Sequence, residues 1–282
     1  MEWRGRRGSG NIEDRRSARG TARAGGIGGL GLIAVLVIGY FLGIDVTPLL
    51  QDTAAPPRSG PVEMTAQDRA AGEFVSVVLA DTEDIWAQVF ADQIGRSYDP
   101  ATLVLYKGVT ASPCGNASGA TGPFYCPGDR KVYLDTDFFT TMEQQLGAQG
   151  DFAMAYVVAH EIAHHVQDEL GILGQANAVR ARVSQADSNQ ISVRIELQAD
   201  CLSGIWARQV SKTFGTIQKG DFEEAVNAAR QIGDDTLQRN AGQRPMPHTF
   251  THGTAAQRSG WFLRGLKSGD LGDCDTFAAK KL

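Results

Sequence analysis

The sequence predicts an α+β fold in which a small sheet packs against helices, preceded by one N-terminal transmembrane helix. Three observations support this: an uncharged run near the N-terminus, two short runs rich in β-branched and aromatic residues, and long helical stretches in the second half. The 282 residues are 42% hydrophobic and 21% charged, which indicates a globular chain. The formal net charge of −5 argues against a general nucleic-acid binder, so we expect no nucleic acid as a partner.

Charge is distributed unevenly along the chain. Residues 1–24 carry seven arginines and three acidic residues, a net +4, so the rest carries −9. Residues 25–44 contain no charge, and as a helix they would be about 30 Å long, the thickness of the hydrocarbon core of a membrane. The positive-inside rule makes residues 1–24 a basic cytoplasmic tail and places the rest outside the cytoplasmic membrane, which the chain would cross once. A cleaved signal peptide and a buried core helix are the alternatives.

A linker and one domain are expected after this run. Three prolines between positions 52 and 65 prevent regular structure, which predicts a linker over 45–64 and a domain over 65–282. The domain opens with a helical pattern over 65–94 that ends in glycine.

The period of the pattern changes within the domain. Strands are predicted at 101–108 and 131–135, where β-branched and aromatic residues cluster. Asp151 can cap a helix that ends at Gly171. Further helices are predicted at 136–147, 175–211, 221–232 and 254–267, with a loop near 242–253.

The four cysteines fit an extracytoplasmic domain, because an even number outside the cytoplasm suggests disulfides. Cys114 and Cys126 bracket a loop rich in glycine and serine, so a local bridge is the natural pairing. Cys201 then pairs with Cys274 and ties the C-terminal segment to a helix. Four free thiols are the alternative, and a zinc knuckle is excluded because no C-x-x-C pair is present.

An H-E-x-x-H motif lies on the helix predicted at 151–171. His160 and His164 are four residues apart, so they share a helix face and can bind one ion. Zinc accepts two imidazoles and needs a third protein ligand if one position stays open for water. Glu161 lies beside that water and can take its proton. Two core histidines are the alternative, but this helix would then bury polar groups without partners.

The third ligand is sought among the later acidic residues and histidines. Candidates are His165, Glu169, Glu196, Asp200, His248 and His252. Glu196 and Asp200 are favoured, because they lie four residues apart on one face of the next long helix. One carboxylate can bind zinc while the other accepts the remaining N–H of a ligand histidine. A solvated acidic face is the alternative for this pair.

These motifs resemble those of gluzincins, the thermolysin-like zinc metallopeptidases. The chain resembles more closely the putative neutral zinc metallopeptidase family of bacterial membrane-anchored proteins. The matching segments are GRRGSGNIEDRR (5–16), VYLD (132–135), AHEIAHHVQ (159–167), ELQADC (196–201), THGTAAQR (251–258) and CDTF (274–277). The resemblance implies a zincin-like domain with one zinc ion per chain, bound by His160, His164 and Glu196. It also implies that Glu161 is the catalytic base and Asp200 the partner of a ligand histidine.

Two further roles are predicted in the cleft of such a domain. The strand at 131–135, with Tyr133, is expected to line the cleft and pair with an extended substrate; an ordinary internal strand is the alternative. His252 or Arg258 can stabilise the oxyanion of a tetrahedral intermediate, and a structural role for His252 is equally compatible with the sequence.

The sequence therefore predicts a membrane-anchored zinc metallopeptidase that hydrolyses peptide or protein substrates outside the cytoplasm. A non-catalytic, zinc-containing envelope binding or assembly protein is the alternative. A structural zinc site is usually closed by a fourth protein ligand, for which His252 is the candidate.

Overall fold

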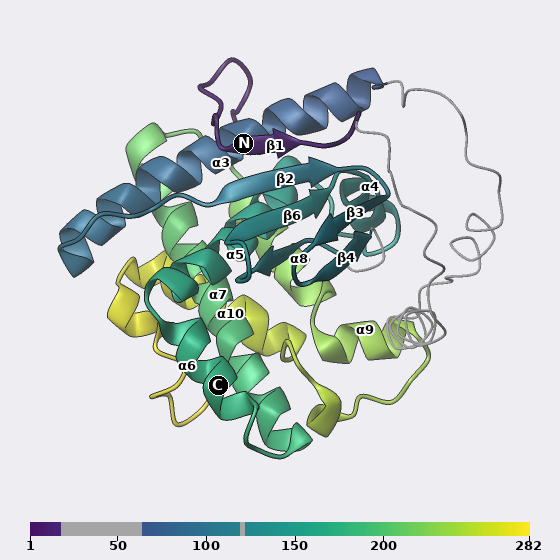
Figure 1. Cartoon of the computed structure of the whole chain (residues 1–282), viewed down its shortest axis with the longest axis vertical. Helices are drawn as coiled ribbons and strands as arrows, with labels where there is room; N and C mark the ends of the chain where they lie inside the picture. Colours follow the sequence, from purple (N-terminus) through teal and green to yellow (C-terminus); the bar gives the residue numbers. More distant parts are fainter. Residues whose placement is uncertain (18–63, 119–121) are drawn as a thin grey trace.

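The computed structural model describes residues 1–17, 64–118 and 122–282, which form an α+β fold (Figure 1). A four-stranded sheet has the order β1-β2-β6-β5. Its first three strands are parallel and β5 is antiparallel to β6. These strands are β1 (Ile12–Asp14), β2 (Thr102–Tyr106), β5 (Phe124–Cys126) and β6 (Lys131–Asp135), and a separate hairpin joins β3 (Val109–Ser112) to β4 (Gly115–Ser118).

Side chains that alternate along β2 and β6 divide between the two faces of the sheet. Leu103 and Leu134 belong to the main core, which they share with the helices. Val104 and Tyr133 belong to a smaller cluster on the opposite face, together with Cys126. The helical side of the sheet therefore carries the main core.

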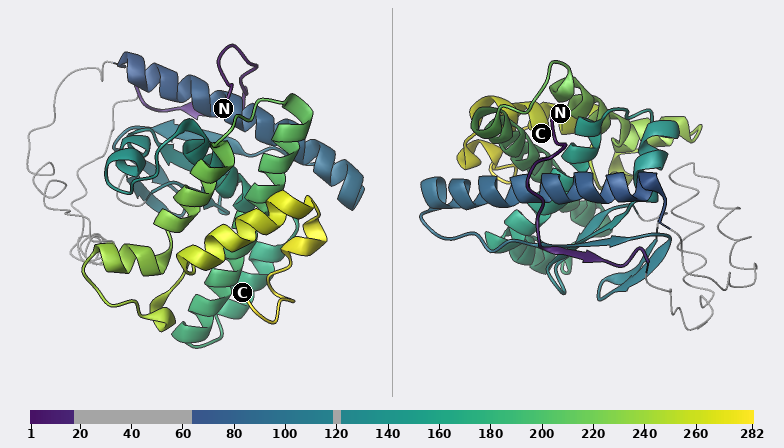
Figure 2. Two further views of the ribbon diagram at one scale, coloured as in Figure 1. Left: turned by 180° about the vertical axis from the view of Figure 1, so that it is seen from behind. Right: turned by 90° about the horizontal axis from the view of Figure 1, so that it is seen from above.

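Helices make up most of the rest of the chain. They are α3 (Ala66–Val89), α4 (Asp137–Gln144), α5 (Asp151–Glu169), α6 (Ile172–Arg180), α7 (Gln185–Phe214), α8 (Asp221–Gln231), α9 (Asp234–Asn240) and α10 (Ala255–Ser268). Short helical turns lie at η1 (Phe90–Ile94), η3 (Pro247–Thr249) and η4 (Leu271–Cys274). In the view from above in Figure 2, α3 crosses the molecule at a level between the strands and the helices of the second half of the chain, while α5 packs against both β6 and α7.

The predicted helices are present, with one break that the periodicity did not reveal. Thr65 caps α3 through a capping box with Asp68. The stretch predicted as one helix over 175–211 is instead two helices, α6 and α7. Ser184 separates them, because its side chain accepts a hydrogen bond from the backbone N–H of Asp187 and starts a new helix.

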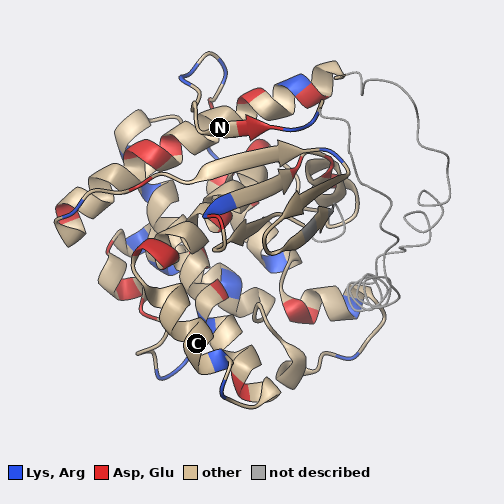
Figure 3. Cartoon of the chain, viewed as in Figure 1, with Lys and Arg blue, Asp and Glu red and all other residues tan. Residues whose placement is uncertain are grey.

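The N-terminal segment differs from the prediction of a tail separated from the domain by a membrane. Residues 1–17 lie against the body, and β1 extends the sheet through parallel pairing with β2. Arg6 forms a two-pronged ion pair with Asp81 of α3, with distances of 2.6 and 2.7 Å. Arg7 pairs with Asp84 of α3 at 2.7 Å. Figure 3 shows the basic positions of this segment beside the acidic positions of α3.

Two glycines allow this segment to approach α3 closely. A Cβ on Gly8 would lie 3.3 Å from the Cβ of Ser76, and one on Gly72 would lie 2.7 Å from Nη1 of Arg16. The guanidinium of Arg16 occupies that space and donates a hydrogen bond to the carbonyl of Asp68. The arginine- and glycine-rich motif at 5–16 is therefore a packing motif for α3.

The predicted fold class needs one correction. Within residues 1–17, 64–118 and 122–282, no helix is both long enough and apolar enough to cross a membrane. The transmembrane helix predicted at 25–44, and all of the predicted linker except Met64, lie outside the described residues. The described residues form an α+β fold, and the prediction of a preceding transmembrane helix finds no support among them.

Candidate metal centre

Two packed helices bring the predicted ligands together. His160, Glu161 and His164 lie on α5, and Glu196 and Asp200 lie on α7. Apolar residues fill the face of α5 that packs into the core, so this helix is held along most of its length.

The donor atoms of His160, His164 and Glu196 lie within 4.8 Å of one another. The Nε2 atom of His160 is 3.1 Å from one carboxylate oxygen of Glu196, and the Nε2 atom of His164 is 3.5 Å from the other. Two imidazole nitrogens and one carboxylate oxygen that converge in this way fit a zinc ion and leave one position for water or substrate.

Oppositely charged neighbours shift the pKa values of His160 and Glu196. Burial lowers the pKa of His160, but Asp200 and Glu196 outweigh it and raise this pKa to about 9. Burial raises the pKa of Glu196, yet the neighbouring histidines hold it well below its ordinary range. Because a metal ion binds the unprotonated ring nitrogen, metal binding at His160 competes with a proton.

Asp200 lies behind His160 at the centre of a buried network. Its Oδ1 atom is 3.0 Å from Nδ1 of His160 and accepts a hydrogen bond of 2.5 Å from the hydroxyl of Tyr156. Arg258 of α10 donates to both oxygens of the same carboxylate, at 2.9 and 3.0 Å. Asp200 therefore lies against the ring of His160, and Arg258 is its counterion.

Gln167 has the corresponding place behind His164. Its side-chain oxygen lies 2.8 Å from Nδ1 of His164, and its amide NH₂ donates to the carbonyl of Ile195 and to the side chain of Gln198. Sequence reasoning missed Gln167, Gln198 and Tyr156. The spacing of three residues from His164 to Gln167 on one helix face was the available signal for Gln167.

A cleft of about 540 Å³ opens over the ligand group. Glu161 lines it, and its side chain makes no hydrogen bond or ion pair with another described residue. His252 lines it too; its backbone N–H donates to Asp234, whose carboxylate also lies 3.3 Å from Nδ1 of the ring. The apolar lining includes Phe124, Phe138, Val157, Leu173, Ile195 and Leu237.

Tyr133 does not lie in this cleft, so its predicted contact with substrate is corrected. Strand β6 pairs with β2 on one side and β5 on the other, which leaves no edge for a peptide. Tyr133 is buried on the sheet face away from the helices, and its hydroxyl donates to Asp129. The strand that reaches the cleft is β5, the last strand of the described sheet.

The other predicted residues are the four cysteines and the alternative metal ligands His165, Glu169 and His248. Cys114 pairs with Cys126 and Cys201 with Cys274, as predicted. His165 lies between Tyr125 and the carbonyl of Asp99, away from the ligand group. The side chain of Glu169 pairs with Arg130 instead of the metal ligands, and His248 lies in η3.

Two histidines one helical turn apart, with a glutamate on a neighbouring helix, form the donor set of a zinc metallopeptidase. The chain belongs to the family described as "putative neutral zinc metallopeptidase", whose profile matches residues 1–277. The family implies zinc as the metal.

Curated relatives are similar along most or much of the chain. The uncharacterized protein YpfJ of Escherichia coli K12 is 45% identical over 286 residues, covering 98% of this chain and 99% of the relative. The uncharacterized protein Rv2575 of Mycobacterium tuberculosis H37Rv is 42% identical over 195 residues, covering 66% of this chain and 65% of the relative. No solved structure matches the chain significantly.

Proposed function

We propose that this protein is a gluzincin-type peptidase that holds one zinc ion per chain and hydrolyses peptide bonds. The convergence of three side-chain donors beneath an open cleft carries the proposal. A purely structural zinc site would need a fourth protein ligand, and His252 is not among the donors that converge in the described part of the chain.

Zinc, when bound, would polarise a carbonyl oxygen and lower the pKa of a water molecule toward about 7. Glu161 lies one residue from His160, faces the cleft and has no competing partner among the described residues, so its carboxylate can accept a proton from water and pass it to the leaving amine. His252, held by Asp234, can donate a hydrogen bond to the developing oxyanion.

An extended peptide fits the cleft through strand β5. The free edge of β5 in the described sheet can pair with the backbone of a substrate, and the apolar lining can take its side chains. Cys126 at the end of β5 is bonded to Cys114, which fixes the strand against the hairpin. We further propose that the domain acts outside the cytoplasm, where its two disulfides would persist.

The test uses the full chain, because residues 1–17 pack against the body. Wild type, Glu161→Gln and the control Glu169→Gln on the same helix are assayed for bound zinc and for cleavage of a diverse peptide library by mass spectrometry. We expect zinc in all three proteins and cleavage only in wild type and Glu169→Gln. Equal cleavage by Glu161→Gln would refute the role of Glu161, and absence of zinc from folded wild type would refute the metal site.

A further inference from the structure

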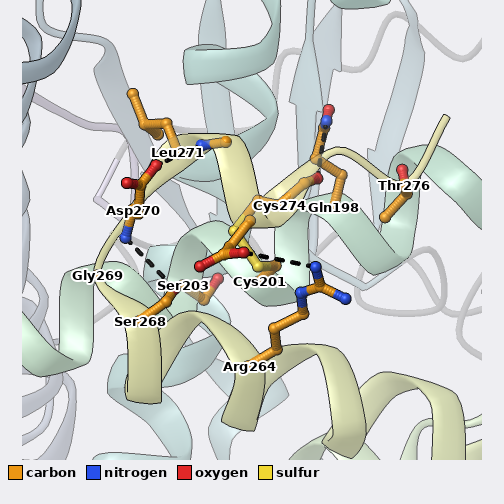
Figure 4. The surroundings of a disulfide bond; sticks show 12 residues. Gln198, Cys201, Ser203, Arg264, Ser268, Gly269, Asp270, Leu271, Cys274 and Thr276 are labelled. Carbon is orange, nitrogen blue, oxygen red and sulfur yellow. Dashed lines mark hydrogen bonds and ion pairs between the residues drawn. A yellow bond between two sulfur atoms is a disulfide. The ribbon is translucent and has the colours of Figure 1, made fainter. Parts of the chain in front are cut away.

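A chain of buried amides leads from the ligand group to the C-terminal segment. The side-chain oxygen of Gln167 lies 2.8 Å from Nδ1 of His164, and the NH₂ of Gln167 donates to the side-chain oxygen of Gln198 at 2.9 Å. The NH₂ of Gln198 donates in turn to the carbonyl of Cys274 at 3.1 Å (Figure 4). Both glutamine side chains are buried, so water does not compete for these bonds.

The hydrogen bonds in this chain of amides can run in only one direction from donor to acceptor. A backbone carbonyl accepts and never donates, so Gln198 must present its NH₂ to Cys274 and its oxygen to Gln167. Gln167 then presents its NH₂ to Gln198 and to the carbonyl of Ile195, which leaves its oxygen for His164. The Nδ1 atom of His164 must therefore carry a hydrogen, and its Nε2 atom keeps the lone pair that faces Glu196.

The position of the Cys274 carbonyl depends on ties between the C-terminal segment and α7. The disulfide joins Cys274 to Cys201 of α7. Two residues later, the hydroxyl of Thr276 donates to the backbone carbonyl of Arg194 at 2.7 Å, and the Arg194 guanidinium donates to the carbonyl of Thr276. Figure 4 shows the disulfide and Gln198 side by side over α7.

We propose that Gln167 and Gln198 are positioning residues that fix the tautomer of the metal ligand His164, and that the Cys201–Cys274 disulfide raises zinc affinity through them. The proposal rests on the metal site of the proposed function and goes beyond it, because it couples a covalent tie in the C-terminal segment to that site. The other disulfide, Cys114–Cys126, makes no bond to this chain of amides.

The first test measures zinc affinity by chelator competition in Gln167→Met and Gln198→Met. Gln167→Met removes the direct partner of a ligand and should weaken zinc binding about 10- to 100-fold. Gln198→Met removes the next amide, one step further from the ligand, and should weaken zinc binding about 3- to 10-fold. Gln238→Met is the matched control, since Gln238 is also buried and, within the described part of the chain, its side chain bonds to Thr249 and Met246 and not to the chain of amides. Equal zinc affinity in Gln167→Met and Gln238→Met would overturn the proposal.

The second test is a double-mutant cycle that a general loss of stability would not reproduce. Replacing Cys201 and Cys274 by Ala should weaken zinc binding several-fold in wild type but little further in Gln198→Met. Replacing Cys114 and Cys126 by Ala should leave zinc affinity unchanged in both backgrounds. If replacing Cys201 and Cys274 lowers zinc affinity by the same factor in wild type and in Gln198→Met, the coupling is refuted.

A spectroscopic readout addresses the tautomer directly. In zinc-loaded wild type, the Nδ1–H of His164 should give a slowly exchanging signal in histidine-selective ¹H–¹⁵N spectra, and Gln167→Met should lose it. Persistence of that signal in the variant would overturn the assigned role. None of these measurements depends on peptidase activity. Zinc bound without cleavage would refute the proposed function alone. Cleavage by wild type, with zinc affinity unaltered in Gln167→Met and Gln198→Met, would refute this proposal alone.

Discussion

Replacing Arg258 by Met tests the buried network behind His160. The side chain of Arg258 is 3% exposed and that of its partner Asp200 is 0% exposed, and two hydrogen bonds of 2.9 and 3.0 Å join them. Methionine removes the guanidinium and leaves the buried carboxylate with the His160 ring and the Tyr156 hydroxyl; removing one partner of a buried ion pair typically costs about 3–5 kcal/mol. For a domain of this size, about 2–4 °C of Tm per kcal/mol gives a loss of roughly 6–20 °C.

The matched control is Arg264→Met on the same helix. Arg264 and its partner Asp273 have side chains 52% and 50% exposed and lie 3.5 Å apart, so this pair should contribute no more than about 1 kcal/mol. The assay is urea unfolding of the full-length, zinc-free protein at pH 7, with both variants measured against wild type. If Arg258→Met loses no more stability than Arg264→Met, then Arg258 is not the counterion that the buried carboxylate requires.

Three other predictions follow from separate features. Cysteines placed at Gly8 and Ser76 should form an intramolecular disulfide in cells, whereas cysteines at Gly10 and Ser76 should not. Mass spectrometry of unreduced digests reads both outcomes. Free thiols at 8 and 76 beside intact native disulfides would show that residues 1–17 lie in another compartment. Burial raises the pKa of Asp135 to about 6, so the folded state binds this proton more tightly than the unfolded chain, and stability should fall by up to about 3 kcal/mol as the pH rises from 4 to above 6. Asp135→Asn should flatten that fall in urea unfolding curves, and an unchanged slope would contradict it. Arg180 lines the cleft and bonds to no acidic group among the described residues, so Arg180→Glu should shift cleavage away from peptides with acidic residues, measured by competition between charge-swapped peptides.

The elements that carry the ligands could be predicted because their signals are local. The spacing of His160 and His164 shows that they share a face of one helix, and the spacing of Glu196 and Asp200 does the same for the next long helix. Both disulfide pairings also followed from the sequence, since one pair brackets a short loop and leaves a single choice for the other. Residue spacing does not reveal the order of strands in the sheet. The prediction for Tyr133 was wrong because its strand, β6, lies inside the sheet and not at its edge.

The packing of the N-terminal segment against the domain was missed for a related reason. Its arginines were counted as a net charge, and net charge does not reveal that Arg6 and Arg7 each face an acid about one helical turn apart on α3. Hydropathy describes a segment by itself, whereas Arg6 and Arg7 pair with acids more than 70 positions further along the chain.

The partners behind the metal ligands depend on how closely α7 and α10 approach each other. Cβ atoms added to Gly204 of α7 or Gly265 of α10 would overlap the backbone carbonyls of Phe262 and Cys201, so only glycine permits this contact. Arg258 lies seven residues before Gly265, about two helical turns, on the same face of α10. The glycine contact therefore sets the separation at which the Arg258 guanidinium meets the carboxylate behind His160. It also brings the end of α10 near Cys201, where the C-terminal segment supplies the carbonyl that orients the partners of His164. One close helix crossing thus supports both histidine ligands, each through a different set of polar side chains.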